Sequence, residues 1–145
     1  MHAIALHTSE FSRHLDLLTS MYRLRRRVFN DRLDWSVSVA GDLEIDVVYD
    51  VLSRIYLLAV SDESEVLGCV GLHPTTGPTM LADTFVNLLA NRAAPSDERT
   101  LESSRFCADT MRSLEPGRNG FNRATFVLFA AMLDTIRARG ARNRS

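Results

Sequence analysis

The stretch LESSRFCAD, residues 101–109, combines a charge pair with the pattern of a buried β-strand. Glu102 precedes Arg105 by three positions in a run that otherwise reads as core strand. Burying an ion pair usually costs more desolvation free energy than the Coulomb attraction returns. A carboxylate in a partly dry cleft can accept a proton, which would make the pair part of a functional site. The alternative is that both side chains lie at a strand end and point to water. The stretch alone leaves both interpretations open.

Carboxylates also gather in GDLEIDVVYD, residues 41–50, which contains Asp42, Glu44, Asp46 and Asp50. A loop of this kind is able to bind a divalent metal, but the glycine-containing ligand spacing of a calcium loop is absent. A solvated acidic loop, or a salt-bridge partner for arginines elsewhere in the chain, is the favoured interpretation. We therefore predict no metal site.

Arginines gather in RLRRRVF, residues 23–29. A nucleic-acid patch is one interpretation, but a single short run in a chain of net charge -1 favours an amphipathic helix with an arginine-rich face. The charge recommends neither nucleic acid nor a membrane as partner. The N-terminus lacks the pattern of a signal peptide, and no 18 consecutive residues are apolar. We expect a cytoplasmic protein.

Other chemistry-bearing residues give weak signals. No P-loop, GxGxxG, HExxH or GxSxG motif occurs. The four histidines have no regular spacing, so surface or structural roles are expected for them. Cys69 and Cys107 each lie in an apolar run without metal-ligand spacing, which indicates reduced core thiols.

The elements that position these residues follow from apolar periodicity. Helices are predicted over residues 8–29, 80–89 and 121–140, the first capped by Thr8 or Ser9 and the last closed by Gly140. Strands are predicted at 3–6, 55–60, 66–72 and 101–109, the middle two as an antiparallel hairpin, with loops at 35–50, 74–78 and 115–120. This order predicts an α/β (α+β) fold of helices on a mainly antiparallel sheet, as a single domain over residues 1–145.

Five blocks of the sequence occur in the order and spacing of one family. They are LRRRVFNDRLDW, LEIDVVYD, YLLAV, LHPTTGPTMLADTF and LESSRF. Together they resemble the acyl-homoserine-lactone synthases, the LuxI-type autoinducer synthases of bacterial quorum sensing. The resemblance covers nearly the whole chain. It implies a fold similar to the GCN5-type acetyltransferases, a twisted sheet flanked by helices, which agrees with the predicted element order.

The resemblance also implies a reaction. Family members join an acyl group, carried as a thioester on acyl carrier protein, to the amine of S-adenosylmethionine, and then lactonise the product with release of methylthioadenosine. No further cofactor is implied. Glu102 would accept the proton of the amine. Asp46 and Asp50 suit the cationic end of the substrate, while Arg25 and Arg105 suit its carboxylate or the acidic loop.

Aromatic residues complete the implied site. Phe29 and Trp35 match family positions that offer an aromatic wall for stacking and cation-π contact, and Phe85 matches the phenylalanine after the ML turn. Plain core packing is the alternative for all three. The resemblance thus implies catalytic roles for Glu102, Arg105 and Asp46, and substrate binding by Arg25, Phe29, Trp35, Asp50 and Phe85.

Three departures from the family pattern bear on activity. Gly71 stands where the family usually has an arginine, so one cation of the acidic pocket is expected to be lost. Asp46 and Asp50 are four positions apart rather than three. Family members continue past the long helix with further strands and a helix that line the acyl pocket and help to dock the carrier protein. We therefore expect a domain truncated at its C-terminal end, with an open sheet edge. A degenerate or truncated synthase without full activity is the alternative function. A small acetyltransferase-like protein using acyl-coenzyme A is a more distant one, because no glycine-rich pyrophosphate loop is visible.

Overall fold

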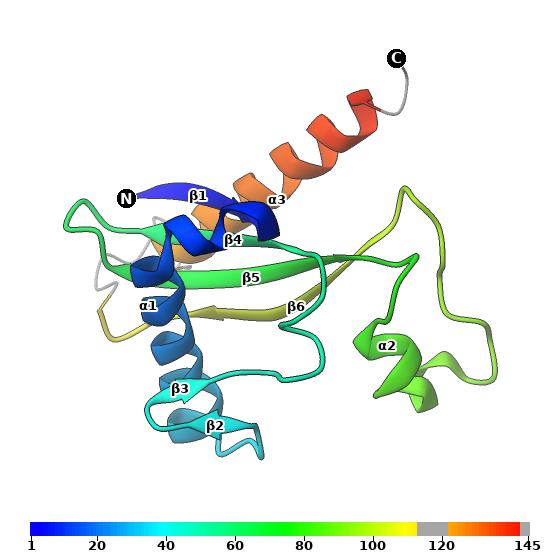
Figure 1. Cartoon of the computed structure of the whole chain (residues 1–145), viewed down its shortest axis with the longest axis horizontal. Helices are drawn as coiled ribbons and strands as arrows, with labels where there is room; N and C mark the ends of the chain where they lie inside the picture. The colour runs from blue at the N-terminus through cyan, green and yellow to red at the C-terminus, as the bar shows by residue number, and fades with distance from the viewer. Residues whose placement is uncertain (113–121, 143–145) are drawn as a thin grey trace.

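The computed structural model describes residues 1–112 and 122–142. Its main feature is a four-stranded antiparallel sheet in the order β1-β4-β5-β6 (Figure 1). The strands are β1 (His2–His7), β4 (Ile55–Val60), β5 (Val66–Pro74) and β6 (Leu101–Ala108). A separate short hairpin pairs β2 (Val39–Ala40) with β3 (Leu43–Glu44) inside the predicted loop. The predicted α+β class and the predicted hairpin of β4 with β5 are confirmed.

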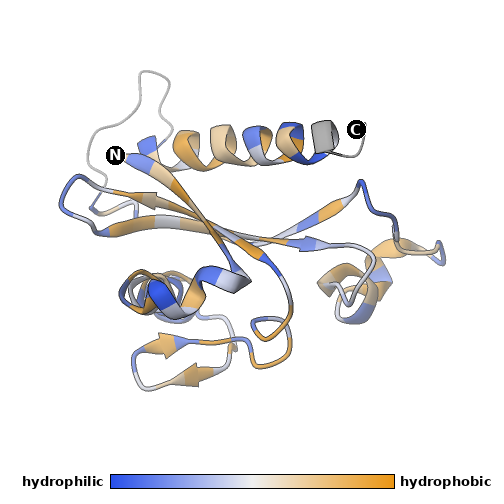
Figure 2. Ribbon diagram, turned by 45° about the horizontal axis from the view of Figure 1, so that its top comes forward, coloured by the Kyte–Doolittle hydropathy of each residue, from blue (hydrophilic) through white to orange (hydrophobic). Residues whose placement is uncertain are grey.

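Helices cover both faces of the sheet. Figure 2 shows α1 (Leu15–Arg25) and the β2-β3 hairpin on one side and α3 (Arg123–Arg142) on the other. Because successive residues of a strand point to opposite faces, Leu57 packs in the core under α3 and Leu58 in the core under α1. Both are fully buried. This double burial explains why β4 reads as a continuous apolar run.

The helix predicted over residues 8–29 is divided into three parts. A 3-10 helix spans Thr8–Arg13, α1 begins two residues later, and wider π-type turns follow over Arg26–Arg32. The hydroxyl of Thr8 does not cap a helix. It accepts from the backbone N–H of Arg54 at 2.9 Å and donates to the carbonyl of Arg54 at 3.1 Å. Thr8 therefore fixes the start of β4, and the prediction of one continuous helix is wrong.

The other predicted helices also have different limits. Residues 80–89 form only α2 (Met80–Asp83) and a 3-10 helix over Val86–Leu89. Apolar side chains there stay exposed, so little packing supports a longer helix. α3 continues past Gly140, because a glycine inside a helix costs only about 1 kcal/mol and does not by itself end it. The predicted loop at 115–120 lies outside the described residues. None of the described helices is long and apolar enough to cross a membrane.

A β-bulge interrupts the pairing of β5 with β6. Cys69 pairs with Cys107 but Gly71 pairs with Ser104, so β6 has one residue more than β5 between these pairs. Arg105 lies in the bulge and has left-handed backbone, with φ 54. The bulge redirects the side chain of Arg105 away from regular strand alternation. As predicted, Cys69 and Cys107 are free buried thiols.

Candidate functional site

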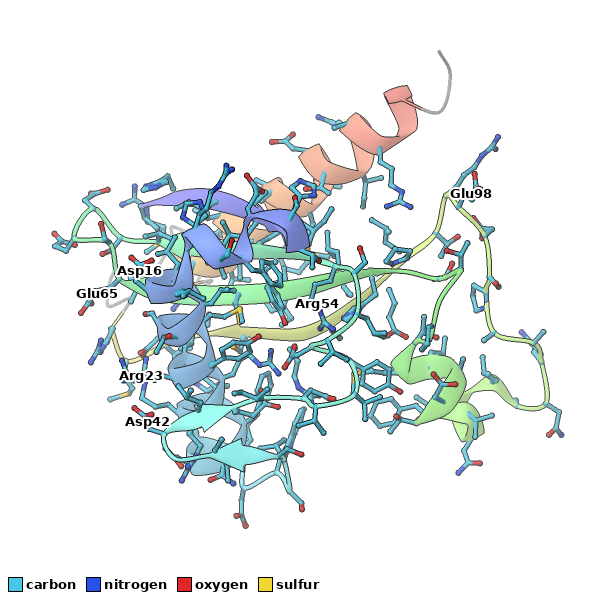
Figure 3. All side chains as sticks on the ribbon, in the orientation of Figure 1. Asp16, Arg23, Asp42, Arg54, Glu65 and Glu98 are labelled. Atoms are coloured by element: carbon cyan, nitrogen blue, oxygen red, sulfur yellow. The ribbon has the colours of Figure 1, made fainter. Side chains whose placement is uncertain are left out.

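Six charged side chains meet between α1, β3 and one face of the sheet. We call this set the charged cluster, and it consists of Arg25, Glu44, Asp46, Asp50, Arg54 and Arg105. α1, the segment from β3 to β4, and the bulge of β6 each contribute members. Figure 3 shows Arg54 between the central strands and the loop that leads from β3 to β4. Residues far apart in sequence therefore form one ionic network.

Arg25 is the buried centre of the charged cluster. Its side chain is 1% exposed, and that of Glu44 is 0% exposed. Nε of Arg25 donates to Glu44, and the terminal nitrogens donate to the two oxygens of Asp50 at 3.1 and 3.0 Å. Burial alone would lower the pKa of Arg25, but Asp50 and Glu44 outweigh burial and raise it well above its usual value. This bidentate geometry fixes the guanidinium in one orientation.

Asp50 is the most heavily bonded acid of the cluster. Besides Arg25, it accepts from Nη1 of Arg54 at 2.9 Å, from the hydroxyl of Tyr56, and from the backbone N–H of Asp46 at 2.6 Å. Burial would raise the pKa of Asp50, yet the charge and hydrogen bonds of Arg25 and the bond from Tyr56 hold it below its usual value. A turn between Asp46 and Asp50, closed by a 2.8 Å backbone hydrogen bond, accommodates the four-residue spacing.

Arg105 closes the cluster from the sheet side. Its Nε lies 3.2 Å from Oε1 of Glu44 and its Nη2 lies 3.0 Å from Oδ2 of Asp46. Asp50 thus pairs with Arg25 and Asp46 with Arg105, which agrees with the interpretation of the acidic segment as a salt-bridge partner for arginines elsewhere in the chain.

An aromatic pair borders the cluster. The rings of Phe29 and Trp35 are stacked with their centroids 5.1 Å apart. The guanidinium carbon of Arg105 lies 5.8 Å from the centroid of Phe29. Phe29 is buried, which fits the core-packing alternative, whereas Trp35 is 50% exposed and presents an aromatic face to solvent.

Glu102 has different partners from Arg105. Its two oxygens accept from the backbone N–H groups of Met80 and Leu81, each at 2.8 Å. These groups open α2, so Glu102 ties β6 to the start of that helix. Arg105 approaches the same place, with Nη1 3.9 Å from Sδ of Met80. Glu102 and Arg105 are both partly buried. Among the described residues they do not form a salt bridge with each other.

Phe85, a member of the implied site, forms no stacking or cation-π contact with the charged cluster or the aromatic pair among the described residues. It lies after α2 and is 48% exposed. The aromatic and cation-π contacts among the described residues do not include its ring. Within the same part of the chain, no group of three or more His, Cys, Asp or Glu side chains is suited to hold a metal ion.

Sequence reasoning missed Arg54, which is 2% exposed. The resemblance implied that Gly71 deprives the pocket of a cation, yet Arg54, the residue just before β4, supplies a third arginine that pairs with Asp50. The available signal was period-2 alternation. Arg54, just before β4, lies on the same face of the sheet as Tyr56 of β4 and as Gly71 and His73 of β5. A single arginine at the start of an apolar strand does not reveal its long-range partners.

A surface or structural role was expected for His73. The surface role is wrong, because the side chain is buried. It is 2% exposed, its Nε2 lies 2.8 Å from Oγ of Ser104, and its ring meets that of Tyr49 edge-on. Burial, and then the charge of Arg54, lower the pKa of His73 to about 4, so the ring is neutral at pH 7. A neutral imidazole thus lies in the wall beside the charged cluster.

Comparisons with known proteins agree with this fold. The profile of the autoinducer synthase family matches residues 9–143. The chain is 42% identical over 118 residues to a probable acyl-homoserine-lactone synthase of Sinorhizobium fredii, covering 81% of this chain and 56% of the relative. It is 38% identical over 140 residues to the acyl-homoserine-lactone synthase of Agrobacterium fabrum, covering 97% of this chain and 66% of the relative.

Solved structures give the same result. The crystal structure of the AHL synthase LasI superposes with a TM-score of 0.78 at 36% identity, over 95% of this chain and 68% of that chain. BjaI, described as a CoA-dependent acyl-homoserine lactone synthase with SAM and isopentyl-CoA, gives 0.80 at 28% identity, over 96% and 62%. The sheet and its flanking helices thus define an acetyltransferase-like fold. The chain belongs to the autoinducer synthase family, and it spans 56% to 66% of the length of the two curated relatives named above.

Proposed function

We propose that this chain carries the S-adenosylmethionine site of an acyl-homoserine-lactone synthase for quorum-sensing signal production. The observation that supports this most directly is a charge balance. Arg25, Arg54 and Arg105 face Glu44, Asp46, Asp50 and Glu102, which gives three positive and four negative charges, or net -1. S-adenosylmethionine carries a sulfonium, an ammonium and a carboxylate, or net +1, so site and substrate are complementary.

The first chemical step needs a proton acceptor. The substrate ammonium gives one proton to a base, its nitrogen attacks the thioester carbonyl carbon, and the thiolate of the donor leaves and takes up the second proton that the nitrogen releases. We assign the first proton to Glu102, directly or through a water. The N–H groups of Met80 and Leu81 hold both oxygens of this carboxylate and so fix its direction. In the second step a carboxylate oxygen of the acylated product attacks the carbon beside the sulfonium, and methylthioadenosine leaves.

The other residues bind and position the substrate in this proposal. Asp46 is the least buried acid of the charged cluster, with 16% of its side chain exposed, and is assigned to the cationic end of the substrate. Arg105 and Arg25 act as positioning residues that hold the acids in place. Trp35 offers its face to the sulfonium. Phe85, exposed near α2, is assigned to the outer wall of the substrate site.

The acyl donor in this proposal is an acyl carrier protein. A coenzyme A thioester is the second candidate, because the solved relative BjaI is described as CoA-dependent. The test incubates the purified chain with S-adenosylmethionine and either an acyl-carrier-protein thioester or an acyl-CoA. Mass spectrometry then follows lactone and methylthioadenosine. We expect both products to form together with the carrier-protein donor. Absence of S-adenosylmethionine binding in calorimetry would reject the proposal, whichever donor is used.

A further inference from the structure

Two buried side-chain polar atoms of the described residues have no hydrogen-bond partner, one in the charged cluster and one in the wall beside it. They are Nη2 of Arg54 and Nδ1 of His73, on side chains that are each about 2% exposed. Leaving a buried polar group unpaired costs about 1 to 3 kcal/mol, and more for a charged group. These two atoms leave hydrogen-bonding capacity for a polar partner that the described residues do not supply.

The register of the strands places these two residues next to each other. Ile55 of β4 pairs with Leu72 of β5. Arg54 precedes Ile55 and His73 follows Leu72, so in an antiparallel pair they lie at the same level and on the same face. The charge of Arg54 acts on His73 and helps to lower its pKa, in agreement with this proximity.

Gly71 leaves the adjoining part of the wall without a side chain. A methyl group at this position would lie 3.5 Å from Nε2 of His73, 3.5 Å from Cε1 of Tyr56 and 3.6 Å from Oγ of Ser104, with no clash. Gly71 therefore leaves room for about one methyl group beside the imidazole of His73, the ring of Tyr56 and the hydroxyl of Ser104.

The other two arginines of the charged cluster have no free nitrogen to offer. All three side-chain nitrogens of Arg25 bond to Glu44 and Asp50. Those of Arg105 contact Glu44, Asp46 and Met80. In Arg54, by contrast, Nε bonds to the carbonyl of Leu52 and Nη1 to Asp50, while Nη2 keeps its hydrogens unpaired.

We propose that Arg54 and His73 form the subsite that binds the α-carboxylate of the substrate, with Nη2 of Arg54 and Nδ1 of His73 donating to its oxygens. This inference rests on the proposed function, because it takes S-adenosylmethionine as the substrate. When the hydroxyl of Ser104 donates to Nε2 of His73, the ring proton of the neutral imidazole is on Nδ1. Both unpaired atoms are then hydrogen-bond donors. The carboxylate of the substrate has two oxygens and can accept a hydrogen bond from each donor.

The test compares two ligands that differ only in this group: S-adenosylmethionine and its decarboxylated form, S-adenosyl-3-methylthiopropylamine. Calorimetry measures the affinity of the full chain for each. His73→Leu and Arg54→Met each remove one donor, His73→Asn restores an N–H near the position of Nδ1, and Arg54→Lys keeps the charge beside Asp50. The matched controls are His2→Leu and Arg23→Met, because His2 is exposed and the half-exposed Arg23 pairs with exposed Asp42.

We expect His73→Leu and Arg54→Met to weaken S-adenosylmethionine binding by about tenfold each, as for loss of a hydrogen bond to a charged group, and to leave the decarboxylated ligand within about twofold. His73→Asn should recover most of the loss. Equal weakening of both ligands, or no weakening of either, would refute the carboxylate subsite while leaving the proposed function standing. If the unmodified chain binds neither ligand, the proposed function fails and this inference fails with it.

Discussion

Arg105 and Asp46 are 59 positions apart in sequence, yet Nη2 of Arg105 lies 3.0 Å from Oδ2 of Asp46. The β-bulge and the left-handed backbone at Arg105 make this contact possible. A non-glycine residue in this conformation carries a steric cost, which the ion pairs to Glu44 and Asp46 offset.

Two substitutions at Arg105 distinguish the effect of its left-handed backbone on stability from the effect of its charge. Arg105→Asn and Arg105→Val both remove the guanidinium, but asparagine tolerates a left-handed conformation and a β-branched residue does not. We expect the free energy of unfolding in urea to be about 1 to 2 kcal/mol lower for the valine variant. Arg112, exposed and outside the left-handed region, is the matched control, where the same two changes should differ little. Equal stability of the two Arg105 variants would show that the bulge is unstrained.

Glu102→Gln tests the proposed proton acceptor. The change removes the basic carboxylate, so turnover should fall by roughly 10² to 10⁴. It also turns an amide N–H₂ toward the backbone N–H of Met80 or Leu81, which should cost about 1 to 3 kcal/mol of stability. Turnover must therefore be measured per folded molecule, with exposed Glu98→Gln as control. Lactone output that stays at the unmodified level in a folded Glu102→Gln protein would sink the assignment.

His73 should make stability depend on pH. Its pKa falls from an unfolded value near 6.5 to about 4 in the folded chain. Between these values the unfolded chain binds the proton and the folded chain does not. The free energy of unfolding should thus fall as pH decreases from about 6.5 to about 4, by at most about 3 kcal/mol. The groups that act on the ring are Arg54, which favours the neutral form, and Glu102, Asp50 and Asp46, which oppose it.

Urea unfolding of His73→Leu at pH 5 and pH 7 checks this. The difference between the two pH values should shrink relative to the unmodified chain, because the leucine cannot titrate. His2→Leu, at an exposed position, should keep the full difference. An unchanged difference in the His73 variant would mean that another group governs stability in this range.

Trp35 gives the site a built-in optical signal. It is the only tryptophan of the chain, is half exposed, and stacks on Phe29. If S-adenosylmethionine covers it, the emission should shift to the blue and saturate with the calorimetric affinity. Asp46→Asn should move the midpoint of this titration to higher ligand concentration. A full calorimetric signal without any change in emission would place the ligand away from Trp35.

Much of this architecture could be predicted from sequence because it depends on local periodicity. The central strands are buried on both faces and therefore have continuous apolar runs, and the turn between them is polar. The hairpin of β4 with β5 could thus be predicted from the sequence. The helix over residues 8–29 was not, because its first turns are rearranged by a hydrogen bond from Thr8 to the distant Arg54. The spacing of apolar residues does not predict a hydrogen bond between residues so far apart in sequence.

The site was predictable to the extent that its residues share sequence blocks with a family. Arg25, Asp46, Asp50 and Arg105 do meet, as those blocks implied. Arg54 lies outside the five blocks, and His73 lies within the block LHPTTGPTMLADTF but without an implied role. Strand register brings the two residues to the same wall. The bulge that aims Arg105 likewise depends on pairing across β5 and β6, which single-sequence patterns do not specify.

The outer face of α3 supports a last prediction, about stability and acyl-chain length. Leu133 and Ile136 are one helical turn apart and are 56% and 51% exposed. Covering such side chains contributes about 1 to 2 kcal/mol each. We expect a chain extended with the C-terminal third of a full-length relative to unfold at higher temperature and to make more long-chain lactone than the unextended chain.

Substitution of the same two residues shows whether the added segment covers this face. Leu133→Gln with Ile136→Gln should change the stability of the unextended chain by less than about 0.5 kcal/mol per site, because these side chains are already largely in water. In the extended chain the pair should cost about 2 to 4 kcal/mol in total. Arg137→Gln, at a neighbouring exposed position, should be neutral in both. Equal stability and equal long-chain output from the two chains would show that the described part already encloses its acyl group and that α3 needs no further cover.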